Sequence, residues 1–161
     1  MSAVSYSKIL RSIKTILVDS NDDALAGLDK CCFMLRKNLI HYDWVGFYFA
    51  DFKNKILHLK AFSGASTEHD SIPFGKGICG QVAVSNQNFI AYNVKEQENY
   101  IACNLSVQSE IVVPLFFEGK NIGQIDVDSN KINSFSKKDE ILLEACCDLI
   151  SKTYGSLLLS L

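Results

Sequence analysis

The sequence predicts an α+β fold, in which a central antiparallel sheet carries the N- and C-terminal helices on one face. Apolar residues recur at helical spacing near the two ends of the 161-residue chain, whereas β-branched and aromatic residues fill most of its middle. Neighbouring strand-like segments are joined by turns too short for the crossover helix that parallel strands need. Helices on one face of such a sheet bury the apolar side of both, so we expect a single domain over residues 1–161.

The helices at the two ends follow from the spacing of apolar residues. Such residues recur every three or four positions over residues 9–17 and again over 25–39, with a polar break at 19–22. Near the other end, Ser136 followed by Asp139 is typical of a helix start, and the helical spacing continues to Ile150. We therefore expect two helices before the sheet and one long helix after it.

The strands are predicted between these helices. Residues 44–49 and 56–62 form one expected hairpin, residues 110–117 and 121–128 form a second, and residues 88–91 form a short strand. Residues 63–70 and 93–105 are expected to be loops, and long loops in compact domains are often functional. A glycine-rich run at 75–80 is expected to make a tight turn, followed by a short helix over 82–85.

Composition narrows the class of function. The 16 basic and 18 acidic residues give a net charge of −2, which argues against a nucleic-acid partner. Only Arg11 and Arg36 are arginines, so a polyanionic ligand is disfavoured. No segment reaches the roughly 20 apolar residues of a membrane helix, and the first twelve residues lack the apolar core of a signal peptide. We expect no membrane partner, a cytoplasmic location and six cysteines that remain thiols.

The cysteines fall into two groups. Pairs at 31–32 and 146–147 lie within predicted helices, where neighbouring side chains point about 100° apart, so they are interpreted as core residues. Cys79 and Cys103 lie in loop or loop-to-helix segments, where reactive groups concentrate. Cys79 follows glycines at a candidate helix N-terminus, whose free N–H groups favour a thiolate. No cysteine or histidine spacing matches a zinc site, so no metal is expected.

Three acidic residues form a second candidate cluster. Asp126 and Asp128 are two apart on one strand, so their side chains share a face. Pairing across the turn at Gly119 would bring Glu110 beside them. If the three carboxyl groups converge, their repulsion would raise at least one pKa towards neutrality; the alternative is a solvated sheet face.

Five motifs then occur in order along the chain: DWVGFY at 43–48, IPFGKGICG at 72–80, IAC at 101–103, SEIVVPL at 109–115 and IDVDS at 125–129. In this combination the chain closely resembles the free methionine-(R)-sulfoxide reductases, a family of stand-alone GAF domains. The resemblance runs from about residue 25 to residue 150, which is most of the sequence.

The resemblance implies a GAF fold with a ligand pocket under loops on the face opposite the helices. It implies that Cys103 is the catalytic cysteine and that Cys79 is a second cysteine near it. The pocket residues that it implies are two aromatic and three acidic side chains, Trp44, Tyr48, Glu110, Asp126 and Asp128. The implied reaction reduces free L-methionine (R)-S-oxide by thiol attack on the sulfoxide sulfur, through a sulfenic acid and then a disulfide. A thioredoxin-like reductant restores the thiols, and no cofactor is required.

Two departures from the family pattern leave an alternative open. The family typically has a third, resolving cysteine shortly before IPFG, but residues 63–71 contain none, and Asn104 stands where many relatives have aspartate. Cys79 or an external thiol would then have to resolve the oxidised Cys103. The alternative is a GAF module that binds a small ligand with little or no turnover. The apolar tail at 157–161 favours a homodimer in either case.

Overall fold

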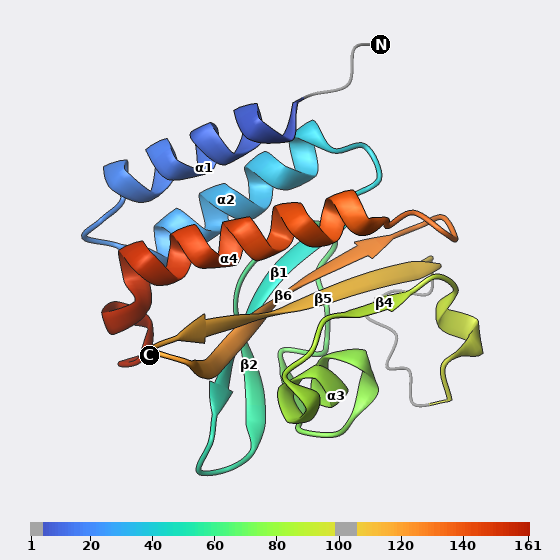
Figure 1. Ribbon diagram of the computed structural model, residues 1–161. Coiled ribbons are helices and arrows are strands. Elements are labelled where there is room, and N and C mark those ends of the chain that lie inside the picture. Colours follow the sequence, from blue (N-terminus) through green and yellow to red (C-terminus); the bar gives the residue numbers. More distant parts are fainter. Residues whose placement is uncertain (1–4, 99–105) are drawn as a thin grey trace.

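The computed structural model describes residues 5–98 and 106–161. Four α-helices, six strands and one short 3₁₀ helix occur within these ranges (Figure 1). In chain order they are α1 (Tyr6–Asp19), α2 (Ala24–Asn38), β1 (Trp44–Asp51), β2 (Ile56–Ser63), β3 (Ser71–Pro73), α3 (Gly77–Ser85), β4 (Phe89–Ala91), η1 (Val94–Glu96), β5 (Ser109–Phe117), β6 (Lys120–Ser129) and α4 (Lys137–Leu158). The predicted α+β class is confirmed.

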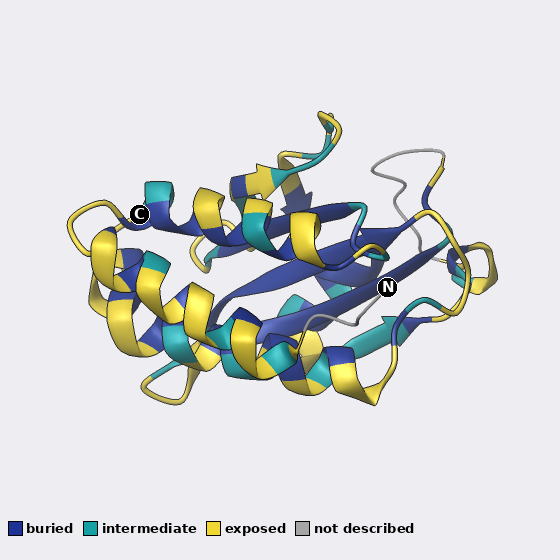
Figure 2. Cartoon of the chain, turned by 90° about the horizontal axis from the view of Figure 1, so that it is seen from above, coloured by how far each residue is buried: buried dark blue, intermediate teal, exposed yellow. Residues whose placement is uncertain are grey.

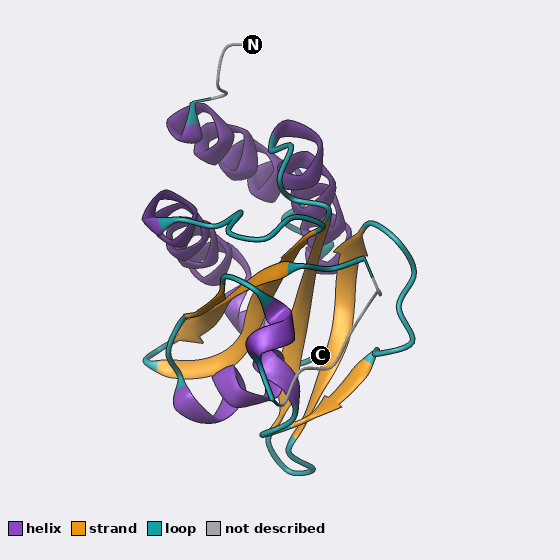
Figure 3. Cartoon of the chain, turned by 90° about the vertical axis from the view of Figure 1, so that its right-hand side faces the viewer, coloured by secondary structure: helices purple, strands orange, loops and turns teal. Residues whose placement is uncertain are grey.

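The six strands form one antiparallel sheet in the order β3-β2-β1-β6-β5-β4. Helices α2 and α4 pack against this sheet, and α1 packs mainly on those two helices. Figure 3 shows the three long helices together on one side of the strands. The predicted gathering of terminal helices on one face is therefore confirmed, with α1 forming an outer layer.

The larger apolar core lies between the helices and the sheet. Alternate residues of β1, β5 and β6, such as Phe47, Val113 and Ile125, meet the buried faces of α2 and α4 there. The cysteine pairs at 31–32 and 146–147 belong to this core and are free thiols, as predicted. Burial raises the pKa of Cys31 to about 12, so its thiol stays protonated and unreactive at physiological pH. In Figure 2 the outer faces of these helices are exposed while the central strands are buried.

The predicted start of the C-terminal helix is also confirmed. Ser136 and Asp139 form a capping box, in which each side chain accepts a hydrogen bond from the other residue's backbone N–H. Asp139 additionally accepts hydrogen bonds from Tyr42 Oη at 2.9 Å and contacts His41 Nε2 at 2.7 Å. These contacts tie the end of the α2–β1 connection to α4.

The structure differs from the sequence prediction around β3 and α3. Strand β3 falls just after the predicted loop, because a three-residue strand has no periodicity of its own and forms only by pairing with β2. Helix α3 begins at Gly77, five residues earlier than predicted, so part of the expected glycine turn is helical. In the described part of the chain, no helix is long and apolar enough to cross a membrane.

Candidate active site

The candidate site lies on the sheet face opposite the long helices, where neighbouring strands bring the predicted residues together. Asp128 is paired in register with Trp44 of β1 on one side and with Glu110 of β5 on the other. Asp126 lies two residues along β6, opposite Gly46. Because side chains two apart on a strand share a face, all of these point away from the helix layer. The predicted convergence of the three acids follows from this register.

These acids are buried rather than solvated. Glu110 is 4 % exposed, Asp126 is fully buried and Asp128 is 1 % exposed, which excludes a solvated sheet face. Burial raises the pKa of Asp126, and polar contacts with Glu110 and Cys79 oppose this only in part. Burial also raises the pKa of Asp128 to well above its usual range, and the neighbouring charge of Asp126 adds to the effect. Such carboxyl groups are suited to holding and donating a proton.

Cys79 is part of the same cluster. Its Sγ donates a hydrogen bond to Glu110 Oε1 at 3.8 Å, and the ligating atoms of Cys79, Glu110 and Asp126 all lie within 4.8 Å of one another. Three groups this close could also share a metal ion.

Helix α3 holds Cys79 over the sheet at its third residue, close to the N-terminus as predicted. The helix can sit this close because Gly80 has no side chain: a Cβ there would lie 2.6 Å from the carbonyl oxygen of Pro73. From the sheet, Gln124 Nε2 donates to the carbonyl oxygen of Cys79 at 3.0 Å. The sulfur therefore has a fixed position relative to the acids.

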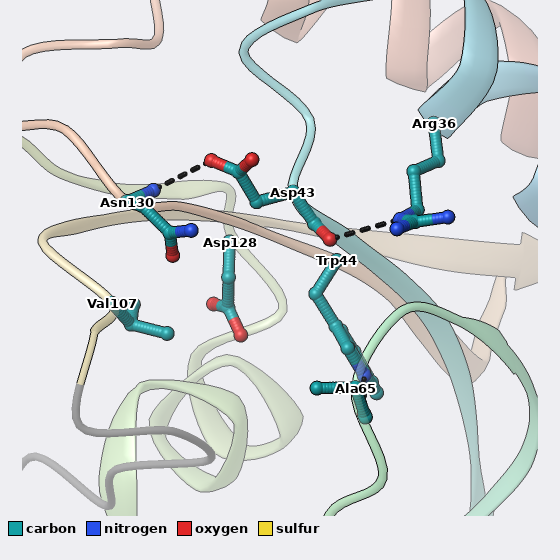
Figure 4. A pocket seen from close by; sticks show the side chains of 7 residues that line it. All are labelled: Arg36, Asp43, Trp44, Ala65, Val107, Asp128 and Asn130. Carbon is teal, nitrogen blue, oxygen red and sulfur yellow. Dashed lines mark hydrogen bonds between the residues drawn. The ribbon is translucent and has the colours of Figure 1, made fainter.

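A pocket of about 210 Å³ opens beside this cluster (Figure 4). It is lined by residues from α2, β1, β6 and four connecting segments, namely Arg36, Asp43, Trp44, Ala65, Val107, Asp128 and Asn130. Of the predicted binding residues, Trp44 and Asp128 line it directly. Tyr48, Glu110 and Asp126 are buried on the same face of the sheet and are not among the residues that line the pocket.

The two predicted aromatic residues are held by the loop after β2. Trp44 Nε1 donates to the carbonyl oxygen of Ala65 at 3.0 Å, and Tyr48 Oη donates to that of His69 at 2.9 Å. Their ring centroids are 6.5 Å apart. The indole ring of Trp44 covers Gly46, where a Cβ would lie 2.2 Å from the ring. Trp44 and Tyr48 thus form one aromatic surface next to the acids.

Cys103, the predicted nucleophile, lies outside the described residues, as does the rest of IAC. The description resumes at Ser106, and Val107 lines the pocket.

Sequence reasoning missed three polar residues of the pocket rim. Arg36, Asp43 and Asn130 come from the end of α2, the residue before β1 and the residue after β6. Nothing in the local pattern places them together, although Arg36 stands out as one of only two arginines.

Comparison with known proteins agrees with this architecture. The GAF domain family matches residues 26–153. The chain is 35% identical over 147 residues to GAF domain-containing protein A of Dictyostelium discoideum, covering 90% of this chain and 89% of that protein. It is 34% identical over 135 residues to the free methionine-R-sulfoxide reductase of Escherichia coli, covering 84% and 79%.

A solved structure gives the same picture. The free methionine-R-sulfoxide reductase of Neisseria meningitidis, solved in complex with its substrate, superposes with a TM-score of 0.90 at 30% identity, covering 100% of this chain and 97% of that one. The fold and the buried pocket thus define a GAF domain. More specifically, the chain belongs to the family of free methionine-R-sulfoxide reductases, which are oxidoreductases.

Proposed function

We propose that this protein reduces free L-methionine (R)-S-oxide to methionine. The observation that carries the proposal is the cluster of buried acids and a thiol beside the Trp44 pocket, in a chain of this reductase family. Reduction of a sulfoxide needs a sulfur nucleophile and a proton donor next to the leaving oxygen. Asp126 and Asp128, whose pKa values are raised, meet the second need.

We assign the role of nucleophile in the first step to Cys103, because IAC resembles the family's catalytic segment. The thiolate attacks the sulfoxide sulfur and the S–O bond of the substrate breaks. The oxygen passes to the cysteine sulfur with a proton from the acid cluster, giving methionine and a Cys103 sulfenic acid. Two electrons pass from the cysteine sulfur to the substrate sulfur, so the cysteine sulfur is oxidised and the substrate sulfur is reduced. Trp44 packs against the apolar part of the substrate, and the ring of Tyr48 lies beside the indole of Trp44.

The second step restores the thiol. A second thiol condenses with the sulfenic acid, forming a disulfide and releasing water. We assign this role to Cys79, whose sulfur lies in the acid cluster. A thioredoxin-like dithiol then reduces the disulfide, a cycle that suits the reducing cytoplasm. We also propose a homodimer, since Leu157, Leu159 and Leu161 are all exposed at the end of the chain.

The test is an assay with purified protein, dithiothreitol and each diastereomer of free methionine sulfoxide. We expect methionine to form from the R diastereomer and not from the S diastereomer, measured by chromatography. Omitting dithiothreitol should stop the reaction after a single turnover. If neither diastereomer yields methionine, the proposed function is wrong.

A second candidate is a GAF module that binds the sulfoxide without turning it over. The specific observation in its favour is the lack of a cysteine at 63–71, where the family's resolving residue usually lies. Calorimetric binding of the free sulfoxide, with no methionine formed in the assay above, would favour this alternative.

A further inference from the structure

Arg36 is a charged residue of the pocket to which the proposed reaction gives no role. It lies in the last turn of α2 and lines the same pocket as Trp44 and Asp128. In Figure 4 it reaches the pocket from the helix, whereas Asp128 reaches it from β6. A cation and a buried acid therefore share one small cavity.

The guanidinium of Arg36 is oriented by the protein but is not neutralised by it. Its Nε donates to the carbonyl oxygen of Asp43 at 3.1 Å, and this is its single hydrogen bond to the described residues. Within the described ranges it forms no ion pair with a carboxylate. The Asp43 carboxylate instead accepts from the backbone N–H of Asn130 at 2.7 Å. The terminal amino groups of Arg36 remain able to bind a ligand.

Arg36 is linked through Asp43 to the strand that carries the acids. Asp126 and Asp128 follow one another along β6, and the backbone N–H of Asp43 donates to the carbonyl oxygen of Asp128 at 2.9 Å. Because Arg36 is bonded to Asp43, it stays next to this strand, and in Figure 4 Asp128 and Arg36 lie on opposite sides of Trp44. A molecule lying along Trp44 would meet acids at one end and a cation at the other.

A free amino acid has the complementary charges, with an α-ammonium group next to an α-carboxylate. We propose that Arg36 binds the α-carboxylate of the substrate, so that it selects free methionine sulfoxide over peptide-bound or amidated forms. This rests on the proposed function. Guanidinium and carboxylate match in charge and in planar geometry, which makes arginine the preferred partner for this group. The acids are then left for the ammonium group and the sulfoxide oxygen.

The test compares Arg36→Gln with the wild-type protein on two substrates, free L-methionine (R)-S-oxide and its carboxamide, in which the carboxylate is replaced by a neutral amide. We expect Arg36→Gln to raise KM for the free amino acid about tenfold or more, with kcat changed less than about twofold, because a charge-assisted hydrogen bond is lost. For the carboxamide, kcat/KM should change less than about twofold. Arg36→Lys should recover part of the lost affinity.

Lys37→Gln is the matched control, since it removes the same charge from the next residue of α2, which is exposed like Arg36 but does not line the pocket. It should leave KM and kcat for both substrates unchanged. If Arg36→Gln changes kcat/KM for neither substrate, or for both equally, while the wild-type protein forms methionine, then Arg36 does not bind the carboxylate. In that case the proposed function still stands. If the wild-type protein forms no methionine, the proposed function fails, and Kd values for the two molecules test Arg36 by the same comparison.

Discussion

Replacing Cys103 by serine is expected to lower the rate of methionine formation by at least about 10³-fold, because a hydroxyl is a far weaker nucleophile than a thiolate. The variant should still bind free methionine sulfoxide, since the acids and Trp44 of the pocket are unchanged. Single-turnover kinetics measured without reductant and a binding isotherm on the same preparation check both expectations.

Cys79→Ser is the matched comparison for this variant. It removes the thiol assigned to the second step, so the first turnover should remain while the disulfide no longer forms. A Cys103→Ser protein that keeps a substantial part of the wild-type rate would exclude Cys103 as the nucleophile. Loss of the first turnover in Cys79→Ser alone would transfer that role to Cys79.

Replacing Asp128 by asparagine is expected to stabilise the fold at neutral pH while it disables the enzyme. The carboxylate of Asp128 is buried, and neither of its oxygens has a hydrogen-bond partner among the described residues. Ionising it there is costly, whereas asparagine stays neutral at every pH. We expect a gain of about 1–3 kcal/mol in the free energy of unfolding at pH 8, measured by urea denaturation.

The direction of the pH dependence follows from the raised pKa of Asp128. Below the pKa of an unfolded aspartate, about 3.9, the group is protonated in both states and costs nothing. As the pH rises, the unfolded chain releases its proton first, so the wild-type protein loses stability until the folded group ionises too. Asp126 contributes in the same sense, because its pKa is also raised. The difference in the free energy of unfolding between Asp128→Asn and the wild-type protein should therefore be small at pH 4 and increase towards pH 8.

The same substitution is expected to lower kcat/KM by about 10²-fold or more, since an amide cannot donate the proton of a carboxylic acid. Glu118→Gln, an exposed acid on the turn between β5 and β6, is the matched control and should change neither stability nor activity. A gap in stability that closes rather than widens with pH would contradict a buried, protonated Asp128.

The acid cluster shows which features of the site can be predicted from the sequence and which cannot. The two-residue spacing of Asp126 and Asp128, and the turn at Gly119, were enough to predict that Glu110 would join them. Their burial was not predictable, because alternating acids in IDVDS are equally typical of a solvated face. Burial depends on α3 and on the loop that carries Ala65 and His69, which reach the sheet through contacts between segments far apart in the chain.

The pocket rim and β3 were missed for the same reason. Arg36, Asp43 and Asn130 meet only because α2 ends beside β1 and because β1 pairs with β6. Strand β3 exists only as the partner of β2. Local periodicity predicts elements longer than one or two turns, as it did for α4, but it contains no information on which short segments pair.

The role of Cys103 as the nucleophile is tested by a single-turnover experiment with the reduced protein, free methionine (R)-sulfoxide and no added reductant. We expect an amount of methionine stoichiometric with the protein, together with a sulfenic acid or a disulfide located on Cys103 by peptide mass spectrometry. Methionine formed while Cys103 remains a thiol would contradict this role.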